Sequence, residues 1–539
     1  MQNKKPRPPR TSDDVMITED QSAVIAFLAD PSTYAGARVE RIDTHASIVF
    51  LAGERAYKLK RAVLFDYLDF STSDKRRVLC EAEVRLNRRT APSLYRGVVA
   101  LTRREDGSYA FGGSGTPVDW LVEMNRFPQE ALFDRLASAG RLDLELMAPL
   151  ATAIAEFHMS AEHRTDHGGE AGMTWVVQGN AAGFAEFGSA CLDPSASSRV
   201  ADDSRRELEE HAALLNRRRE SGFVRQCHGD LHLRNIVLLD GRPTLFDGVE
   251  FNDEISCTDV LYDLAFLLMD LWRRRLPRHA NAVWNRYLAE TRDLAGVPLL
   301  PLFLSCRAAV RAKTSATAAQ LQKDVPARSE LHGLARDYLA MAEQLLHPLG
   351  PSLIAVGGLS GSGKSTLALG LAPLVGAVPG AVVLRSDEIR KRLCGVPLLE
   401  PLGPEGYSSQ VSERVYATLA ERAAVTVRGG HSAVVDAVYA RPSDRQVIEQ
   451  VAAAASVPFV GLWLEAPEPV LIARTEQRRN DPSDADANVV RMQRAQARGE
   501  IAWSRIDASL SAPSVLSGAT DRVREQLTGG LNDLADQVQ

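Results

Sequence analysis

Gly358-Leu359-Ser360-Gly361-Ser362-Gly363-Lys364-Ser365 is the stretch of sequence that decides the fold of the second half of the chain. It fits the pattern Gly-x-x-x-x-Gly-Lys-Ser at every position. The glycines let successive backbone N–H groups point at one anion without Cβ clashes, and the helix start that follows adds its positive dipole end. We expect Lys364 to reach the β- and γ-phosphates of a nucleotide and the Ser365 hydroxyl to bind Mg²⁺. The predicted nucleotide contacts are Gly358, Ser360, Gly361, Ser362, Gly363, Lys364, Ser365 and Thr366.

The sequence on either side of this loop predicts a parallel sheet. The apolar run Leu353–Val356 comes directly before the loop, and a helical pattern follows it. Further short apolar runs, separated by helical stretches, lie at Ala381–Leu384, Ala433–Val435 and Val457–Leu464. Such alternation indicates an α/β P-loop domain with helices on both faces of a parallel sheet.

Two carboxylates in this half follow predicted strands. Asp387 comes shortly after Leu384, and ligands of open α/β sheets bind at the carboxyl ends of the strands. Asp387 is therefore a candidate to take a proton from an acceptor hydroxyl, with a helix N-cap at Ser386 or Asp387 as the alternative. Asp436 directly follows Val435, where it either supports Mg²⁺ or substrate or has a structural role.

Two arginines further along are candidates for a mobile lid. Arg474 and Arg478 are one helical turn apart, so they face the same way. A solvated helix face is the ordinary explanation of such a pattern. Phosphoryl transfer, however, needs mobile cations over the γ-phosphate, and these two residues are the best candidates.

Residues from about 350 to 520 resemble the small P-loop kinases, a group that includes polynucleotide kinase, gluconate kinase, the zeta toxins and chloramphenicol phosphotransferase. The resemblance depends on the P-loop, on Asp387 after a strand and on the two arginines. It implies transfer from MgATP to a hydroxyl group, with Asp387 as base and Lys364, Arg474 and Arg478 as the catalytic cations. It does not fix the acceptor.

The first half carries a second ordered set of polar residues. Asp230 and Asn235 lie five positions apart, and Asp247 follows twelve residues after Asn235. Between them, Ile236–Leu239 and Thr244–Phe246 predict a hairpin around Asp240-Gly241. Kinase chemistry needs one carboxylate for the acceptor hydroxyl, an Asn for one Mg²⁺ and a second carboxylate between metal and phosphates. We expect Asp230, Asn235 and Asp247 to take these roles in that order.

Such a site also needs a lysine on a strand and a glutamate on a helix. Ser47–Leu51 and Arg55–Leu59 predict a hairpin at Gly53, and Ser73–Arg89 predicts a helix. Lys58 and Lys60 face the same side of their strand, so spacing alone does not choose between them. Glu81 or Glu83 is the expected partner on the helix, and Ser47 is a candidate to cap the phosphates.

Residues from roughly 20 to 345 resemble the aminoglycoside phosphotransferase family through this set. The resemblance implies a protein-kinase-like bilobal α+β fold, with an N-lobe of about five strands and a larger helical C-lobe. It favours Lys58 over Lys60, makes Val122-Glu123-Met124 the hinge that binds adenine, and makes Asp259 and Asp263 structural. The sequence departs from the kinase pattern in one place, since Thr44-His45-Ala46-Ser47 stands where a Gly-rich loop is expected.

The length of 539 residues calls for at least two domains. The break His347–Ser352 contains Pro and Gly and separates the two motif sets. The predicted division is a basic tail at 1–18, a kinase-like domain at 19–346, a linker at 347–352, a P-loop domain at 353–520 and a C-terminal tail at 521–539.

The composition of the chain bears on its partners and on its cellular compartment. The net charge of -6 gives no whole-chain argument for nucleic acid or an anionic membrane as partner. The basic N-terminus is not followed by an apolar stretch, and no apolar run approaches the ~18 residues of a membrane span. The six cysteines are scattered, which is typical of a reducing compartment and predicts a cytoplasmic protein.

The leading hypothesis is a bifunctional kinase that uses ATP and Mg²⁺ and phosphorylates small hydroxylated acceptors. One alternative makes the second half a kinase of nucleic-acid ends, with a basic groove near Arg385, Arg390, Lys391 and Arg392. Another makes the first half a ligand-sensing module that regulates a P-loop ATPase, because the Gly-rich loop is missing. The sequence does not indicate an oligomeric state.

Overall fold

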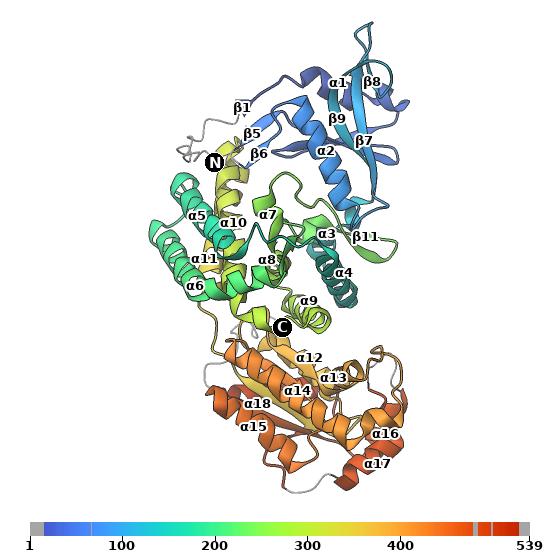
Figure 1. The fold of residues 1–539 in the computed structure, drawn as a ribbon, viewed down its shortest axis with the longest axis vertical. Coiled ribbons are helices and arrows are strands. Elements are labelled where there is room, and N and C mark those ends of the chain that lie inside the picture. The colour runs from blue at the N-terminus through green and yellow to red at the C-terminus, as the bar shows by residue number, and fades with distance from the viewer. Residues whose placement is uncertain (1–15, 66, 478–482, 497–499, 528–539) are drawn as a thin grey trace. The chain divides into compact units, whose positions relative to one another are not determined.

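The computed structural model describes residues 16–65, 67–477, 483–496 and 500–527. The chain forms two compact units (Figure 1). Unit 1 comprises residues 1–267 and 309–339, and unit 2 comprises residues 268–308 and 340–539. The segment 268–308 therefore packs with the P-loop half, although the sequence assigned it to the kinase-like domain 19–346.

The sheet of unit 1 is antiparallel and, within the described residues, has six strands in the order β2-β3-β4-β9-β7-β8. These strands are β2 Val39–Asp43, β3 Ser47–Ala52, β4 Arg55–Lys60, β7 Tyr95–Arg103, β8 Tyr109–Phe111 and β9 Thr116–Asn125. A smaller sheet joins β1 Met16–Ile17, β5 Val63–Phe65 and β6 Leu68–Asp69. The predicted hairpin is confirmed, since β3 and β4 pair across a turn in which Gly53 has φ 55°.

Helix α2, Ser73–Asn87, covers β7 and β9. It begins at Thr72, whose side chain accepts a hydrogen bond from the Lys75 N–H. Its apolar residues Cys80 and Val84 pack with Leu51 and Val122 of the sheet. This packing fixes the helix that carries the predicted glutamate.

The segment Val122-Glu123-Met124, the hinge that the resemblance implied, is part of strand β9. Its residues pair with β4 on one side and β7 on the other. The chain leaves the sheet only after Asn125, so Glu123 is a strand residue.

The rest of unit 1 is mainly helical. Its helices include α3 Phe133–Ser138, α4 Met147–Ser160, α5 Gly169–Phe187, α6 Pro194–Glu220 and α7 Asp253–Ser256. The strand pairs are β10 Val224–Gln226 with β13 Cys257–Asp259 and β11 Ile236–Leu239 with β12 Arg242–Leu245. Asp240 and Gly241 both have positive φ, at 49° and 74°, which is the two-residue turn that the Asp-Gly pair predicted. The chain passes between the two units within α8 Val260–Arg273, α10 Leu300–Leu321 and α11 Val325–Leu345.

The sheet of unit 2 is parallel, and its described strands follow the order β15-β16-β14-β17-β18. They are β14 Leu353–Gly358, β15 Val382–Arg385, β16 Ala433–Asp436, β17 Phe459–Glu465 and β18 Ser504–Asp507. The helices are α12 Lys364–Leu371, α13 Ser386–Leu393, α14 Ser409–Arg428, α15 Pro442–Ala455, α16 Glu468–Gln477, α17 Ala487–Gln496 and α18 Ala512–Gln526. Helices α12 and α18 pack together on the sheet, while α14 contacts β15 and β16, and α15 contacts β17.

Helix α9, Pro277–Thr291, covers the free edge of β15. The Asn285 side chain accepts a hydrogen bond from the Val383 N–H at 2.6 Å and donates one to the Ala381 carbonyl at 3.1 Å. Asn281 donates to the same carbonyl at 3.1 Å. These amides take the place of a neighbouring strand, which explains why 268–308 belongs to unit 2.

Among the described residues, one helical segment, Leu294–Leu321, has the length and the hydropathy of a membrane span, with a mean hydropathy of 1.4. In the structure 72% of that window is buried inside the protein. The core helix of a globular protein has the same properties, so the segment is weak evidence for a membrane.

Candidate active sites

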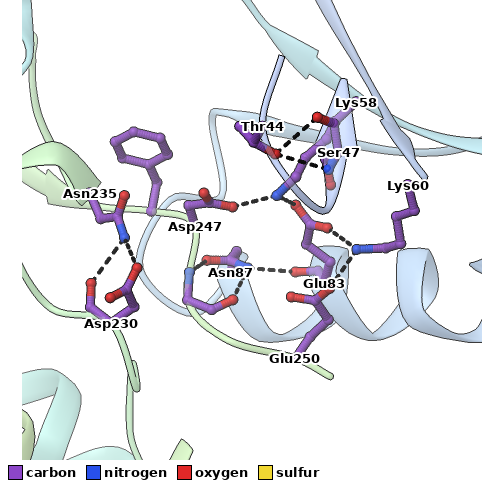
Figure 2. A network of polar contacts seen from close by, with 12 residues as sticks. Thr44, Ser47, Lys58, Lys60, Glu83, Asn87, Asp230, Asn235, Asp247 and Glu250 are labelled. Carbon is purple, nitrogen blue, oxygen red and sulfur yellow. Dashed lines mark hydrogen bonds and ion pairs between the residues drawn. The ribbon is translucent and has the colours of Figure 1, made fainter. Parts of the chain in front are cut away.

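The two lysines of β4 share one buried glutamate (Figure 2). Lys58 Nζ lies 2.8 Å from Glu83 Oε1 and 2.5 Å from Asp247 Oδ1. Lys60 Nζ lies 2.5 Å from Glu83 Oε2 and 2.5 Å from Glu250 Oε1. Each oxygen of Glu83 therefore binds a different lysine. The alternation of β4 brings both lysines to the same side, as its period of two requires.

Of the two glutamates that the sequence left open, Glu83 contacts the lysines. Glu81 lies on the exposed side of α2 and pairs with Arg77 at 3.0 Å. Glu83 replaces Glu81 as the partner of Lys58, because position 83 lies on the face of α2 that packs against the sheet.

The lysines and carboxylates of this cluster shift one another's pKa values. Burial would lower the pKa of Lys58, but the carboxylates of Asp247, Glu83 and Glu250 outweigh it and raise the pKa well above its usual value. Burial would raise the pKa of Glu83, and the two lysines instead lower it to about 2. For Glu250, burial prevails over Lys60, so the pKa of that carboxyl is raised.

Asp230 and Asn235 lie in contact in the segment before β11. Asn235 Nδ2 donates to the Asp230 carbonyl at 2.9 Å and to its Oδ2 at 3.0 Å. His232 Nε2 lies 3.3 Å from the same carboxylate. Burial tends to raise the pKa of Asp230, but the charge and hydrogen bond of His232, helped by His228 and Arg311, hold it well below its usual range. The carboxylate is therefore ionised at neutral pH.

Asp263 of α8 binds the backbone of the residues just before Asp230. Its carboxylate accepts hydrogen bonds from the backbone N–H groups of His228 at 3.1 Å and Gly229 at 2.8 Å. His158 Nε2 lies 3.1 Å from it, and all of these groups are buried. Asp259 forms a similar buried pair with Arg218 at 2.7 Å. Both contacts are of the structural kind that the family resemblance implied.

Asp247 is held in an unusual backbone conformation. Its φ is 60°, and its N–H donates to the Tyr95 hydroxyl at 3.0 Å. The next residue, Gly248, donates to Asn87 Oδ1 at 2.7 Å, which ties the segment to α2. Asn87 was not predicted, although it lies one helical turn after Glu83 on the same face of α2.

Asn235 and Asp247 offer oxygen ligands of the kind that Mg²⁺ prefers. The Asn235 amide nitrogen is directed to Asp230, which leaves its Oδ1 for a cation. The Asp247 side chain is 42% exposed and uses Oδ1 for Lys58. The donor set therefore fits a magnesium–nucleotide complex, which would be held by these two residues.

The Thr44–Ser47 turn that stands in place of a Gly-rich loop is closed on itself (Figure 2). The Ser47 N–H donates to Thr44 Oγ1 at 2.9 Å, and the Thr44 N–H donates to the Ser47 carbonyl at 2.9 Å. Ser47 is 5% exposed. Its N–H already has an acceptor, so a phosphate contact from the Ser47 N–H would require this turn to open.

The P-loop of unit 2 needs its glycines for steric reasons. Gly358, Gly361 and Gly363 have φ values of 140°, 82° and 90°. A Cβ on Gly361 would lie 2.3 Å from the Leu471 carbonyl oxygen, and one on Gly358 would lie 2.7 Å from that of Leu464. The loop therefore packs closely on its neighbours while its helix, α12, begins at Lys364.

The two residues that the motif assigns to phosphate and metal have protein partners in this structure. Ser365 Oγ donates to Asp436 Oδ2 at 2.5 Å, because β16 is aligned with β14 and ends beside the loop. Burial raises the pKa of Asp436, an effect that Lys364, Arg385 and Ser365 oppose. Lys364 Nζ donates to the Leu359 carbonyl at 3.1 Å.

A residue that the sequence did not indicate also contacts the P-loop. Gln493 of α17 accepts a hydrogen bond from the Ser360 N–H at 2.9 Å. The Gln493 amide oxygen thus takes up a backbone N–H of the kind that P-loops direct at phosphate. No motif marks this residue, because the contact depends on how α17 packs.

Asp387 lies in the first turn of α13, and β15 ends at Arg385. The N-cap of α13 is Arg385, without a side-chain cap, so neither Ser386 nor Asp387 takes the capping role. Arg385 bridges towards Glu388 at 3.0 Å and Asp436 at 3.5 Å. Asp387 is thus placed near the carboxyl edge of the sheet, as the sequence predicted.

The predicted lid is only partly described. Arg474 donates to the Ala508 carbonyl at 2.7 Å, and Arg478 lies outside the described residues. Two other arginines, Arg491 and Arg494 of α17, pair with Glu468 at 3.6 and 2.5 Å. These exposed cations were not predicted.

Comparison with known proteins gives one family match in each half of the chain. The model of the phosphotransferase enzyme family matches residues 124–299, and the model of an AAA domain matches residues 353–499. The protein named "Uncharacterized protein Rv2004c" from Mycobacterium tuberculosis is 32% identical over 461 residues, 83% of this chain and 88% of that protein.

Two further matches cover one half each. An adenylyl-sulfate kinase from Myxococcus xanthus is 33% identical over 119 residues, which are 22% of this chain and 59% of that enzyme. The crystal structure of a choline/ethanolamine kinase family protein from Mesorhizobium loti is 14% identical, with a TM-score of 0.38, and covers 60% of this chain and 94% of that one.

A kinase-like phosphotransferase domain followed by a P-loop kinase-like domain defines a phosphotransferase of composite architecture. Within that class, the chain belongs to the family of the mycobacterial protein Rv2004c, with which it shares most of its length.

Proposed function

We propose that the chain is a bifunctional kinase that transfers the γ-phosphate of MgATP to hydroxyl groups of small molecules, once in each unit. The observation that carries the proposal is that each unit brings together the side chains that its motif assigns to phosphate and metal. In unit 1 these are Lys58 with Glu83, beside Asp247. In unit 2 they are the P-loop with Ser365 against Asp436.

In unit 1, Asp230 orients the acceptor hydroxyl. The hydroxyl oxygen attacks the γ-phosphorus, the bond from that phosphorus to the β-bridging oxygen breaks, and ADP leaves. The hydroxyl proton passes to Asp230 and then to solvent. Because its pKa is low, Asp230 accepts this proton late, when the oxygen has already bonded to phosphorus. Asn235 and Asp247 hold Mg²⁺, and Lys58 binds the phosphates.

In unit 2, Lys364 and the P-loop amides bind the β- and γ-phosphates, and Ser365 binds Mg²⁺ with support from Asp436. Asp387 receives the acceptor proton. Arg474 and Arg478 remain candidates for the lid, which requires Arg474 to leave the Ala508 carbonyl.

A small acceptor is favoured over a nucleic-acid end in unit 2. Lys391 is 1% exposed and pairs with Asp484 at 2.8 Å, while Arg390 is buried and donates to the Gly406 carbonyl. The basic run that the nucleic-acid alternative depended on is thus largely internal. The similarity to an adenylyl-sulfate kinase, an enzyme named for a small acceptor, points the same way.

We place this activity in the cytoplasm. ATP is supplied there, and the six cysteines are unpaired, which suits a reducing compartment.

Calorimetric titration of the full chain with Mg²⁺ and a non-hydrolysable ATP analogue tests the proposal. The expected stoichiometry is two nucleotides per chain. Lys364→Ala should leave one, and Lys58→Met should remove the other, because each deletes the cation that faces the phosphates. A wild-type stoichiometry of one that Lys364→Ala abolishes would favour a ligand-sensing first unit.

A further inference from the structure

The ion cluster of unit 1 has an exposed half and a buried half. Lys58 and Asp247 are 15% and 42% exposed at their side chains. Lys60, Glu83 and Glu250 are 1%, 0% and 5% exposed. The residues that the proposed mechanism uses therefore lie at the open end, and the mechanism assigns no role to Lys60 or Glu250.

Nucleotide binding would change the partners at the open end. In the proposed function Asp247 binds Mg²⁺ and Lys58 binds phosphate, so their 2.5 Å contact with each other has to be given up or shared. Glu83 would then keep only part of its attraction to Lys58. A fully buried carboxylate with a weakened partner is costly, because burial penalises an uncompensated charge.

Lys60 supplies Glu83 with a partner that does not take part in this exchange. Its ammonium is buried, contacts Glu83 Oε2 and Glu250 Oε1 at 2.5 Å each, and lies 4.9 Å from the centre of the Phe70 ring. None of these neighbours is a predicted ligand of metal or phosphate. Nucleotide binding as proposed therefore does not compete for this contact.

Lys60 also joins two elements that must stay together. Glu83 belongs to α2, whereas Glu250 lies three residues after Asp247 on the metal-binding segment. A second tie runs between the same elements, from Asn87 to Gly248 at 2.7 Å. Figure 2 shows Lys60 between Glu83 and Glu250, on the side of Glu83 away from Asp230 and Asn235.

We propose that Lys60 and Glu250 are positioning residues that keep Glu83 and the Asp247 segment assembled, so that Lys58 retains its glutamate when nucleotide draws Asp247 away. In protein kinases the lysine–glutamate pair has to be in place for activity, and moving the glutamate helix controls it. In this protein Lys60 binds Glu83 as well, so helix α2 is not free to move its glutamate away from Lys58. Unit 1 is therefore held in a nucleotide-ready arrangement without an activating signal. This inference rests on the proposed nucleotide site of unit 1.

The test uses the full chain with Lys364→Ala, so that any nucleotide bound belongs to unit 1. Into this background we place Lys60→Met together with Glu250→Gln, which removes the buried pair without leaving either charge alone. Calorimetry with Mg²⁺ and the non-hydrolysable ATP analogue is expected to show about tenfold weaker binding, which is the size of one lost charged contact. Glu81→Gln is the matched control, because Glu81 lies on the same helix in an exposed pair, and it should leave the affinity unchanged.

The pH dependence separates positioning from a general loss of stability. Lys60 helps to lower the pKa of Glu83, so its removal raises that pKa, and binding by the double variant should weaken further as the pH falls from 8 to 6. Binding by the Lys364→Ala parent should stay flat over that range. Parent-like affinity and a flat profile in the double variant would overturn the inference. If the double variant does not fold, Glu250→Gln alone replaces it: weaker Mg²⁺-dependent binding supports the inference, and unchanged binding overturns it. A Lys364→Ala parent that binds no nucleotide would instead remove the proposed function of unit 1.

Discussion

Single residues in this protein owe their ionisation to specific neighbours. Asp230 is the clearest case, because His232 and the Asn235 amide both face its carboxylate. The pKa of Asp230 lies below its usual range, so its charge does not change across the neutral pH range. Any loss of unit 1 activity in mildly acidic solution should therefore come from another group.

Asp230→Ala should lower turnover in unit 1 by roughly 10²-fold or more, as loss of a general base typically does. Nucleotide affinity should change little, because Lys58 and Asp247 carry the phosphate and metal contacts. Phosphate transfer from labelled ATP to a metabolite extract measures the first quantity, and calorimetry of the same variant measures the second. Turnover close to that of the wild type, or a loss of nucleotide binding that accounts for the lost turnover, would refute the assigned role.

His431 of unit 2 should make stability depend on pH. It is buried, and its Nε2–H donates to the Gly380 carbonyl at 2.9 Å. Burial lowers its pKa to about 4, whereas the unfolded chain takes up the proton near pH 6.5. The unfolded state thus binds more protons between these values, and stability should fall by roughly 3 kcal/mol as the pH drops from 6.5 to 4.

Thermal unfolding followed between pH 7.5 and pH 4.5 measures this effect. His431→Gln keeps a hydrogen-bond donor without a titrating ring, so its unfolding midpoint should decline less steeply with acid than that of the wild type. Parallel declines would show that the acid sensitivity comes from other residues.

At the level of elements, α17 contacts the P-loop through Gln493. Its amide oxygen occupies the Ser360 N–H at 2.9 Å, which nucleotide has to displace. Gln493→Ala should therefore tighten nucleotide binding in unit 2 by several-fold, the equivalent of a hydrogen bond worth about 1 kcal/mol. Calorimetry in a chain with Lys58→Met isolates this site. Weaker binding would mean that Gln493 contacts the nucleotide instead.

Helix α9 should stabilise unit 2 through its asparagines. Asn285→Ala leaves the Val383 N–H and one bond to the Ala381 carbonyl without a side-chain partner, which should cost about 1–3 kcal/mol. Denaturant unfolding measures the change. Arg278→Ala, an exposed position on the same helix, is the control and should have little effect. Equal stability of Asn285→Ala and the wild type would show that α9 does not support the sheet.

At the scale of the molecule, the sequence predicted both folds and the local motifs of both sites. Motifs succeed where one short segment fixes its own geometry, as the P-loop and the Asp230–Asn235 segment do. Contacts that depend on packing were missed, including Gln493, Asn87 and Glu250. The short strand β18 was missed because Ile506 is its one apolar residue, which gives no periodic pattern.

The cover that α9 provides for β15 bears on aggregation. An open strand edge offers unpaired N–H and C=O groups, and it is a template for pairing with other chains. The matches to the two family models end at 299 and begin at 353, and α9 lies within the first of them. A fragment cut between the matches would carry the P-loop sheet without its covering helix. Such a fragment should self-associate through β15, so the solubility of the P-loop sheet depends on a helix that lies outside its own family match.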